Sequence, residues 1–288
     1  MTDFRPLLMR AEGVHAPGCY DALSAALIEQ AGFEATYLSG ASIAYTQLGK
    51  PDIGLVSMSE VADVLMRIRD RIGLAIAVDA DTGFGNALNV ERTVRTFERA
   101  GANAIQLEDQ TLPKRCGHLT GKTLVSSGEM VGKIKAALDT RQSEATLIIA
   151  RTDAIAVEGF AAALDRAEAY LEAGADVLFV EAPSSLEEMK QVCARFGGRV
   201  PLLANMVEGG ATPVKTRNEL LELGYRLIIS PGALVRAITP VMEALLAELC
   251  ETGSSHAWQE RMLDLSQLNQ RLELKEILAQ AESYADCE

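Results

Sequence analysis

Two apolar segments of strand length end in carboxylates that could hold a divalent metal ion. Asp79 and Asp81 close the segment that starts at Leu74, and Glu108 closes the segment AIQLE. Asp79 and Asp81 are two residues apart, so on an extended chain both side chains point to the same side. Hard oxygen ligands without a nearby His or Cys suit Mg²⁺ or Mn²⁺ and make zinc a poor fit.

A second group of reactive side chains lies in residues 111–126, TLPKRCGHLTGKTLVS. This segment is much longer than the roughly two to six residues of a usual strand-to-helix loop, which predicts a lid over a site. Cys116 stands among cations and an imidazole, so its thiolate would be stabilised, or its thiol could be a proton donor of tuned acidity. The neighbours are Lys114, Arg115, His118 and Lys122.

The other apolar segments also end in polar residues, namely Ser39, Arg151, Asp153, Glu181 and Asn205. A charge at the end of a buried strand is unfavourable unless it is paired or binds something, which indicates a binding site. The alternative is that these side chains cap the helices that follow. For Asp153 both interpretations stay open: it either caps a helix or holds Arg151.

These residues sit in a repeated pattern of alternating helix and strand. Four times a helix-like stretch ends in Gly and runs into a short apolar segment, starting at Ala31, Ala100, Ala173 and Leu223. Gly supplies the cap of the helix, and the apolar segments have the length of strands buried on both faces. Four more apolar segments bring the expected strands to eight. Amphipathic stretches separate them, at residues 21–31, 59–71, 90–100, 127–138, 158–173, 185–196 and 215–223.

Eight such units in about 250 residues predict a closed (β/α)8 TIM barrel of class α/β. An open doubly wound sheet would favour a GxGxxG turn after the first strand, and the sequence has none there. We therefore expect residues 1–288 to form a single barrel domain. About 234–288 of it is a C-terminal helical extension, with helical stretches at 234–250 and 258–285, that packs elsewhere, such as on another subunit.

Composition excludes several classes of partner. The 288 residues carry a net charge of −13 without a basic cluster, which argues against nucleic acid or an anionic membrane as a partner. No apolar run could span a membrane and the first ten residues lack a signal-peptide core, so a cytoplasmic location is expected. The five scattered cysteines suggest neither a disulfide framework nor a zinc site.

The combined motifs resemble the isocitrate lyase and phosphoenolpyruvate mutase superfamily. The matching phrases run in order over residues about 15–240: YLSGAS, LGKPDIGL, VDADTGFGN, LEDQ, PKRCGH, ARTDA, FVEAP, ANMVEGGATP and SPGALVRA. KRCGH together with DADTGFG is specific for the superfamily and is similar to its short lyase branch, the 2-methylisocitrate and 2,3-dimethylmalate lyases. The resemblance implies a Mg²⁺-dependent enzyme acting on a small carboxylate, and a homotetramer that exchanges its C-terminal helices.

The resemblance also implies residue roles. Asp79 looks like the direct metal ligand, and Asp52, Asp81 and Glu108 look like ligands through water. Ser39, Gly40 and Ala41 resemble a cradle for the carboxylate of a 2-oxo acid, and Arg151 resembles the cation that pairs with the substrate. Further expected substrate contacts are Gly117, Glu181, Asn205 and Arg236, although a helical Arg236 facing solvent is an equal alternative.

The implied reaction is retro-aldol cleavage of a branched 2-hydroxy di- or tricarboxylate to pyruvate or a related 2-oxo acid. Tyr37 or a metal-linked water would take the hydroxyl proton, Lys114 and His118 would hold the enolate with Arg151, and Cys116 would protonate it. The alternatives are a phosphonopyruvate-type mutase or hydrolase, an oxaloacetate decarboxylase, and a barrel that only binds. SGAS and LTGK depart from the SGGG and RPNK of methylisocitrate lyases, so the substrate stays open.

Overall fold

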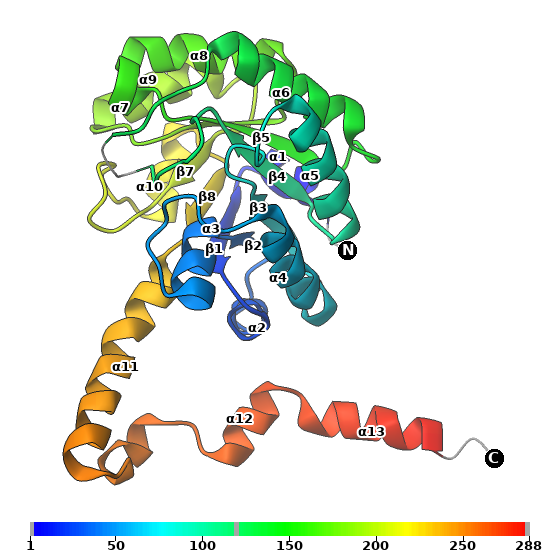
Figure 1. Cartoon of the computed structure of the whole chain (residues 1–288), viewed down its shortest axis with the longest axis vertical. Helices are drawn as coiled ribbons and strands as arrows, with labels where there is room; N and C mark the ends of the chain where they lie inside the picture. The colour runs from blue at the N-terminus through cyan, green and yellow to red at the C-terminus, as the bar shows by residue number, and fades with distance from the viewer. Residues whose placement is uncertain (1–2, 118–120, 286–288) are drawn as a thin grey trace. The chain divides into compact units, whose positions relative to one another are not determined.

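The computed structural model describes residues 3–117 and 121–285. Its eight parallel strands follow the order β6-β5-β4-β3-β2-β1-β8-β7. A parallel bridge between Leu178 and Leu202 joins β6 to the segment before β7, so the sheet curls into a nearly closed barrel with helices outside (Figure 1). The predicted (β/α)8 barrel is confirmed.

The strands match the eight apolar segments of the sequence. They are β1 (Val14–Cys19), β2 (Ala35–Leu38), β3 (Ala75–Asp79), β4 (Ala104–Glu108), β5 (Leu147–Thr152), β6 (Val177–Val180), β7 (Leu203–Asn205) and β8 (Leu227–Ser230). Nearly every residue in them is buried, as expected for parallel strands that are covered by helices on one side and face the barrel interior on the other.

Helices alternate with the strands in the first part of the chain. They are α1 (Phe4–Met9), α2 (Ala22–Gln30), α3 (Gly40–Ile43) with a π-helical turn (Ala44–Leu48), α4 (Met58–Arg71), α5 (Ala87–Arg99), α6 (Ser127–Thr140), α7 (Ile155–Glu158), α8 (Phe160–Glu172), α9 (Leu186–Phe196) and α10 (Arg217–Leu223). Side-chain caps fix several starts. Asn86 accepts hydrogen bonds from the amides of Leu88 and Asn89, so α5 begins three residues before the predicted position.

Two apolar clusters form the core. One lies between the strands and the surrounding helices, and the other fills the barrel interior. The interior cluster includes Phe4, Leu7 and Leu8 of α1, a helix that the sequence analysis did not predict. Arg5 Nη2 donates to the carbonyl of Glu144 at 2.9 Å and to Asp176 Oδ1 at 2.8 Å, just before β5 and β6. Helix α1 thus closes the end of the barrel where the strands begin.

The chain divides into two compact units, Met1–Val235 and Arg236–Glu288, with the barrel in the first. The second unit contains most of α11 (Ala233–Thr252), a 3-10 helix (His256–Arg261), α12 (Leu265–Arg271) and α13 (Leu274–Ala285). The prediction of one helical stretch over 258–285 is wrong. Asp264 caps a new helix there, and Glu273, with a φ of 60°, interrupts it before α13. Among the described helices, none has the length and apolarity needed to cross a membrane.

Candidate active site

The strand order brings the predicted site residues to one end of the barrel. In the ladder, Asp79 of β3 pairs with Gln106 of β4, and Glu108 of β4 pairs with Arg151 of β5. Arg151 pairs in turn with Phe179 of β6, and its guanidinium lies 5.1 Å from the centre of that ring. Catalytic groups of TIM barrels come from this carboxyl end of the strands.

A buried ion-pair cluster joins the predicted lid to the loop after the π-helical turn and to the segment that follows β3. Lys114 Nζ lies 2.6 Å from Asp52 Oδ1 and 2.7 Å from Asp81 Oδ1. Asp81 has a left-handed backbone, with a φ of 47°, a strained conformation of the kind that collects at functional sites. Burial raises the pKa of Asp81 to about 7, helped by the negative charges of Asp79 and Asp52 and opposed by Lys114.

Gly40 faces this cluster. A Cβ placed on Gly40 would lie 3.4 Å from both Asp79 Oδ2 and Asp81 Oδ1. Ser39 is buried and caps α3, since its Oγ accepts a hydrogen bond from the Ser42 amide at 3.2 Å. The predicted cradle of Ser39, Gly40 and Ala41 therefore lies directly beside the carboxylates.

The donor set fits a hard divalent cation. Around this point the described side chains offer carboxylate oxygens, and both Asp81 Oδ1 and Glu108 Oε1 are buried without a well-oriented hydrogen bond. Burial raises the pKa of Glu108 well above its usual value, an effect that Arg151 opposes. Among the described residues no three acidic, His or Cys side chains already stand in ligand positions, and the Lys114 ammonium lies between two of the expected ligands.

Tyr37 supports Asp79 from inside the barrel. Its hydroxyl donates to Gln106 Oε1 at 2.8 Å, and Gln106 Nε2 donates to Asp79 Oδ1 at 3.1 Å. Burial, followed by the charge of Asp79, raises the pKa of the Tyr37 phenol well above its usual value. Gln106 was not among the predicted site residues, although an amide in the apolar strand AIQLE indicates a buried hydrogen-bond partner.

Arg151 lies between two acidic strand ends. Its Nη1 is 3.3 Å from Glu108 Oε2, and its Nη2 is 3.9 Å from Glu181 Oε1. Glu181 also accepts hydrogen bonds from Asn205 Nδ2, at 3.2 and 3.3 Å, while Asn205 Oδ1 is buried without a partner in the described structure. The residue after Glu181, Ala182, has a left-handed φ of 61°.

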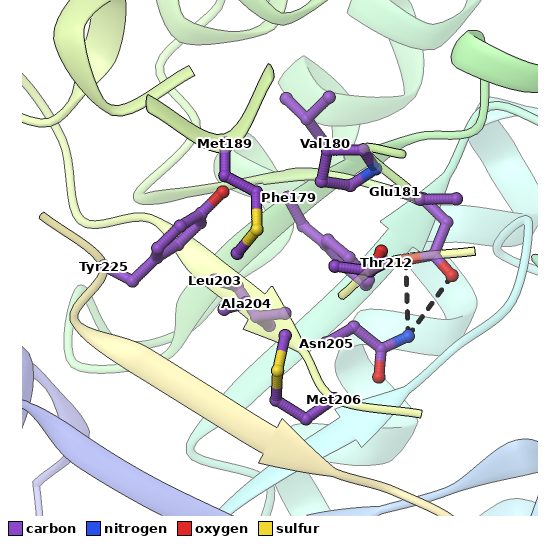
Figure 2. A pocket seen from close by; sticks show the side chains of 12 residues that line it. Phe179, Val180, Glu181, Met189, Leu203, Ala204, Asn205, Met206, Thr212 and Tyr225 are labelled. Atoms are coloured by element: carbon purple, nitrogen blue, oxygen red, sulfur yellow. Dashed lines mark hydrogen bonds between the residues drawn. The ribbon is translucent and has the colours of Figure 1, made fainter. Parts of the chain in front are cut away.

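Glu181 and Asn205 border a narrow cavity of about 10 Å³, which has room for about one water molecule (Figure 2). Glu181 and Asn205 form its polar wall, and Met189, Met206 and Tyr225 contribute to the rest of its lining. The cavity is too small to hold the substrate itself.

Residues 116 and 117 of the predicted lid lie close to Asp52, Arg151 and Glu181. The Cys116 amide donates to the Asp52 carbonyl at 3.2 Å, and the Cys116 side chain is partly exposed. A Cβ on Gly117 would lie 2.4 Å from Arg151 Nη2 and equally close to Glu181 Oε1. His118 lies outside the described residues.

Two buried lysines hold neighbouring loops. Lys122 Nζ donates to the Gly117 carbonyl and, at 2.9 Å, to Asp153 Oδ1. Lys133 of α6 donates to the Thr82 carbonyl at 3.1 Å, in the turn that follows Asp81. Arg236, the remaining predicted contact, belongs to the second unit of the chain, and its role stays a prediction.

Comparison with known proteins assigns the family. Residues 4–250 match the family model of phosphoenolpyruvate phosphomutase. The chain belongs to the phosphoenolpyruvate mutase family. Among the relatives of this family member, the 2,3-dimethylmalate lyase of Eubacterium barkeri is 44% identical, over 98% of this chain and 96% of the relative. The 2-methylisocitrate lyase of Aeropyrum pernix is 50% identical, over 87% and 80%.

Solved structures of similar proteins agree with the fold. A crystal structure of 2,3-dimethylmalate lyase has a TM-score of 0.92 at 34% identity and covers 99% of this chain and 96% of its own. A structure of oxaloacetate acetylhydrolase with 3,3-difluorooxalacetate has a TM-score of 0.93 at 32% identity, with 98% and 96% covered. A phosphonopyruvate hydrolase was solved with oxalate and Mg²⁺, and has a TM-score of 0.87 at 29% identity, with 99% and 100% covered. The chain is an enzyme of the lyase type.

Proposed function

We propose that the protein is a Mg²⁺-dependent carbon–carbon lyase that cleaves a branched 2-hydroxy di- or tricarboxylate, of the 2,3-dimethylmalate or 2-methylisocitrate type, to pyruvate or a related 2-oxo acid. The observation that carries the proposal is the placement of Cys116 and Gly117. The backbone amide of Cys116 donates to the backbone carbonyl of Asp52, one of the expected metal ligands, and a Cβ on Gly117 would contact Arg151, so these two lid residues lie beside the loop and the cation that the proposal uses.

The oxygen ligands come from β3, β4 and the loop after α3. Asp79 would hold Mg²⁺ directly, and Asp52, Asp81 and Glu108 would hold it through water. When bound, Mg²⁺ supplies a Lewis acid that lowers the pKa of the substrate hydroxyl. Mn²⁺ would serve in the same role, because it takes the same oxygen ligands.

The chain's own residues then orient and protonate the substrate. The backbone of Gly40 and Ala41, with Ser39, binds the carboxylate next to the reacting hydroxyl, and Arg151 pairs with an anionic oxygen of the substrate. As the C2–C3 bond breaks, its electron pair passes to the departing carboxylic acid fragment as an enolate, and Lys114 and His118 balance that negative charge. The Cys116 thiol gives its proton to the enolate carbon.

Proton removal from the hydroxyl is the step for which Tyr37 and a water molecule were both candidates. Tyr37 is buried, its hydroxyl already donates to Gln106, and its raised pKa disfavours the phenolate. These observations support Tyr37 as a positioning residue for Asp79 and leave the proton to a water molecule.

The test is product formation from a panel of substrates with Mg²⁺ present. We would supply 2,3-dimethylmalate, 2-methylisocitrate, oxaloacetate and phosphonopyruvate, measure pyruvate by a coupled lactate dehydrogenase assay, and identify the other products by NMR. The proposal expects turnover of one of the first two substrates and its loss in Cys116→Ser. Cys250→Ser, which changes an exposed cysteine of α11, is the matched control and should stay active.

Three outcomes would favour the alternatives. Turnover of only phosphonopyruvate or oxaloacetate to pyruvate, with Cys116→Ser fully active, would indicate a P–C bond enzyme or a decarboxylase. Production of oxalate and acetate would single out the acetylhydrolase, the activity named for one similar structure. Binding without turnover of any substrate would support a barrel that only binds.

We also propose a homotetramer in which the C-terminal helices are exchanged. Large apolar side chains of the second unit support this, because Leu246, Leu265 and Ile277 are each more than half exposed in the isolated chain. Light scattering should give four times the chain mass of 30.9 kDa. A monomer with full activity would contradict the proposal.

A further inference from the structure

Asp153 is a fully buried carboxylate shared by two cations. Arg151 Nε donates to Asp153 Oδ2 at 2.9 Å, and Arg151 Nη2 donates to Asp153 Oδ1 at 3.1 Å. Lys122 Nζ donates to the same Oδ1 at 2.9 Å. No step of the proposed reaction assigns a role to Asp153 itself, so this buried charge requires another explanation.

Helix capping does not explain it. The helix that follows, α7, begins after Ala154 and has no side-chain cap. The backbone of Asp153 is instead held by Asp109, because the Asp153 amide donates to Asp109 Oδ1 at 2.9 Å. Asp109 Oδ2 accepts from Thr152 Oγ1 at 2.7 Å and from the Tyr170 hydroxyl at 2.8 Å. The carboxylate is therefore held rigidly at the end of β5.

The geometry of the guanidinium shows what this carboxylate does. A guanidinium has a side edge, made of Nε and one Nη, and an end edge, made of both Nη groups. Asp153 takes the side edge of Arg151. The end edge points towards Glu108, at 3.3 Å, and Glu181, at 3.9 Å, where the proposed metal and substrate positions are.

The second cation connects the same carboxylate to the lid. Lys122 donates both to Asp153 and to the carbonyl of Gly117, the residue that lies against Arg151 Nη2. Asp153 thus fixes the substrate-binding cation and, through Lys122, the loop residue that touches that cation.

We propose that Asp153 is a positioning residue for Arg151: it holds the side edge so that the end edge meets a carboxylate of the substrate, and it holds Gly117 in place through Lys122. The proposal rests on the proposed function in that it takes Arg151 as the substrate-binding cation.

The test is a double-mutant cycle on KM and kcat. Asp153→Asn frees the side edge, so KM for the hydroxy acid should rise about 10- to 100-fold while kcat changes less. With Arg151→Met in the background, adding Asp153→Asn should change KM less than about twofold, because a residue that acts through Arg151 has nothing left to position. Lys122→Met should raise KM about tenfold, and this variant keeps the test decisive if Asp153→Asn does not fold.

Asp176→Asn is the matched structural control. Asp176 is also a largely buried carboxylate bound to two cations, Arg5 at 2.8 Å and Arg141 at 2.6 Å, but it lies before β6 at the opposite end of the barrel. It should lower the unfolding temperature and leave KM unchanged. If Asp153→Asn does the same, Asp153 is only structural and the proposal is overturned.

Binding of oxalate in the presence of Mg²⁺, measured by calorimetry on the same variants, separates the two proposals. If wild type turns over a hydroxy acid and neither KM nor oxalate affinity changes in Asp153→Asn, the positioning role is wrong and the lyase stands. If no hydroxy acid is turned over and Asp153→Asn still weakens oxalate at least tenfold, the lyase is wrong and the positioning role stands. Absence of both turnover and oxalate binding in wild type would overturn both.

Discussion

Gly117→Ala introduces a single methyl group at a tight contact of the site. Its Cβ would lie 2.4 Å from Arg151 Nη2 and 2.4 Å from Glu181 Oε1, whereas ordinary contacts begin at 3.4 Å. The loop or both side chains must therefore move by about 1 Å. Arg151 cannot move freely, because Asp153 holds its side edge, and Glu181 is held by Asn205.

A displacement of about 1 Å in a substrate-binding group costs roughly 100-fold in rate. We therefore expect kcat/KM of Gly117→Ala to fall about 100-fold, which corresponds to about 2.7 kcal/mol. Gly117 has no left-handed φ, so the alanine introduces no backbone strain and the loss comes from the contact alone.

The assay is pyruvate release at saturating Mg²⁺, together with the thermal unfolding midpoint of each variant. Gly132→Ala is the control, because Gly132 lies inside α6 with no atom within 4 Å of an added Cβ. It should keep full activity and gain about 0.5–1 kcal/mol of stability. Wild-type kcat/KM in Gly117→Ala would refute the close approach of the lid to Arg151.

Three further predictions concern the metal end of the site. Tyr37→Phe should lower kcat less than about tenfold, because the hydroxyl only supports Gln106. A fall in kcat of more than about 100-fold across the pH–rate profile would show that Tyr37 is the base. Lys133→Met frees the turn at Thr82 and should raise the Mg²⁺ concentration needed for half-maximal activity about 10- to 100-fold. An unchanged half-maximal Mg²⁺ concentration would contradict this role. Asp81 has a pKa raised to about 7, so it is protonated below that pH and protons compete with the metal ion. The Mg²⁺ affinity, measured by calorimetry, should therefore rise up to about tenfold per pH unit until about pH 7 and then level off. A constant Mg²⁺ affinity from about pH 5 to 8 would show that Asp81 takes no part in binding the metal ion.

The sequence predicted the barrel and the strand-end residues because both depend on local order along the chain. Apolar segments that end in Asp79, Glu108 and Arg151 define strands, and parallel strands place their ends together. The family comparison then confirmed the superfamily and the lyase activity that the motifs implied.

What the sequence could not supply depends on register between strands and loops. The contact of Tyr37 with Gln106 spans 69 positions of the chain, and that of Lys122 with Asp153 spans 31. For Asp153 the sequence offered capping and pairing equally, and only the three-dimensional contacts separated them. The short helix α1 also escaped prediction, because its six residues show apolar periodicity for less than two turns.

Helix α1 has a consequence for how the chain reaches this structure. Phe4, Leu7 and Leu8 complete the barrel interior, yet the partners of Arg5 lie 139 and 171 positions later. During synthesis the contacts of Arg5 therefore cannot form until the chain beyond Asp176 has left the ribosome, so α1 is held by its full set of partners only late. Contacts of such long sequence separation slow folding. An N-terminal truncation that removes α1 should thus expose the open end of the barrel and raise the demand for chaperones during synthesis.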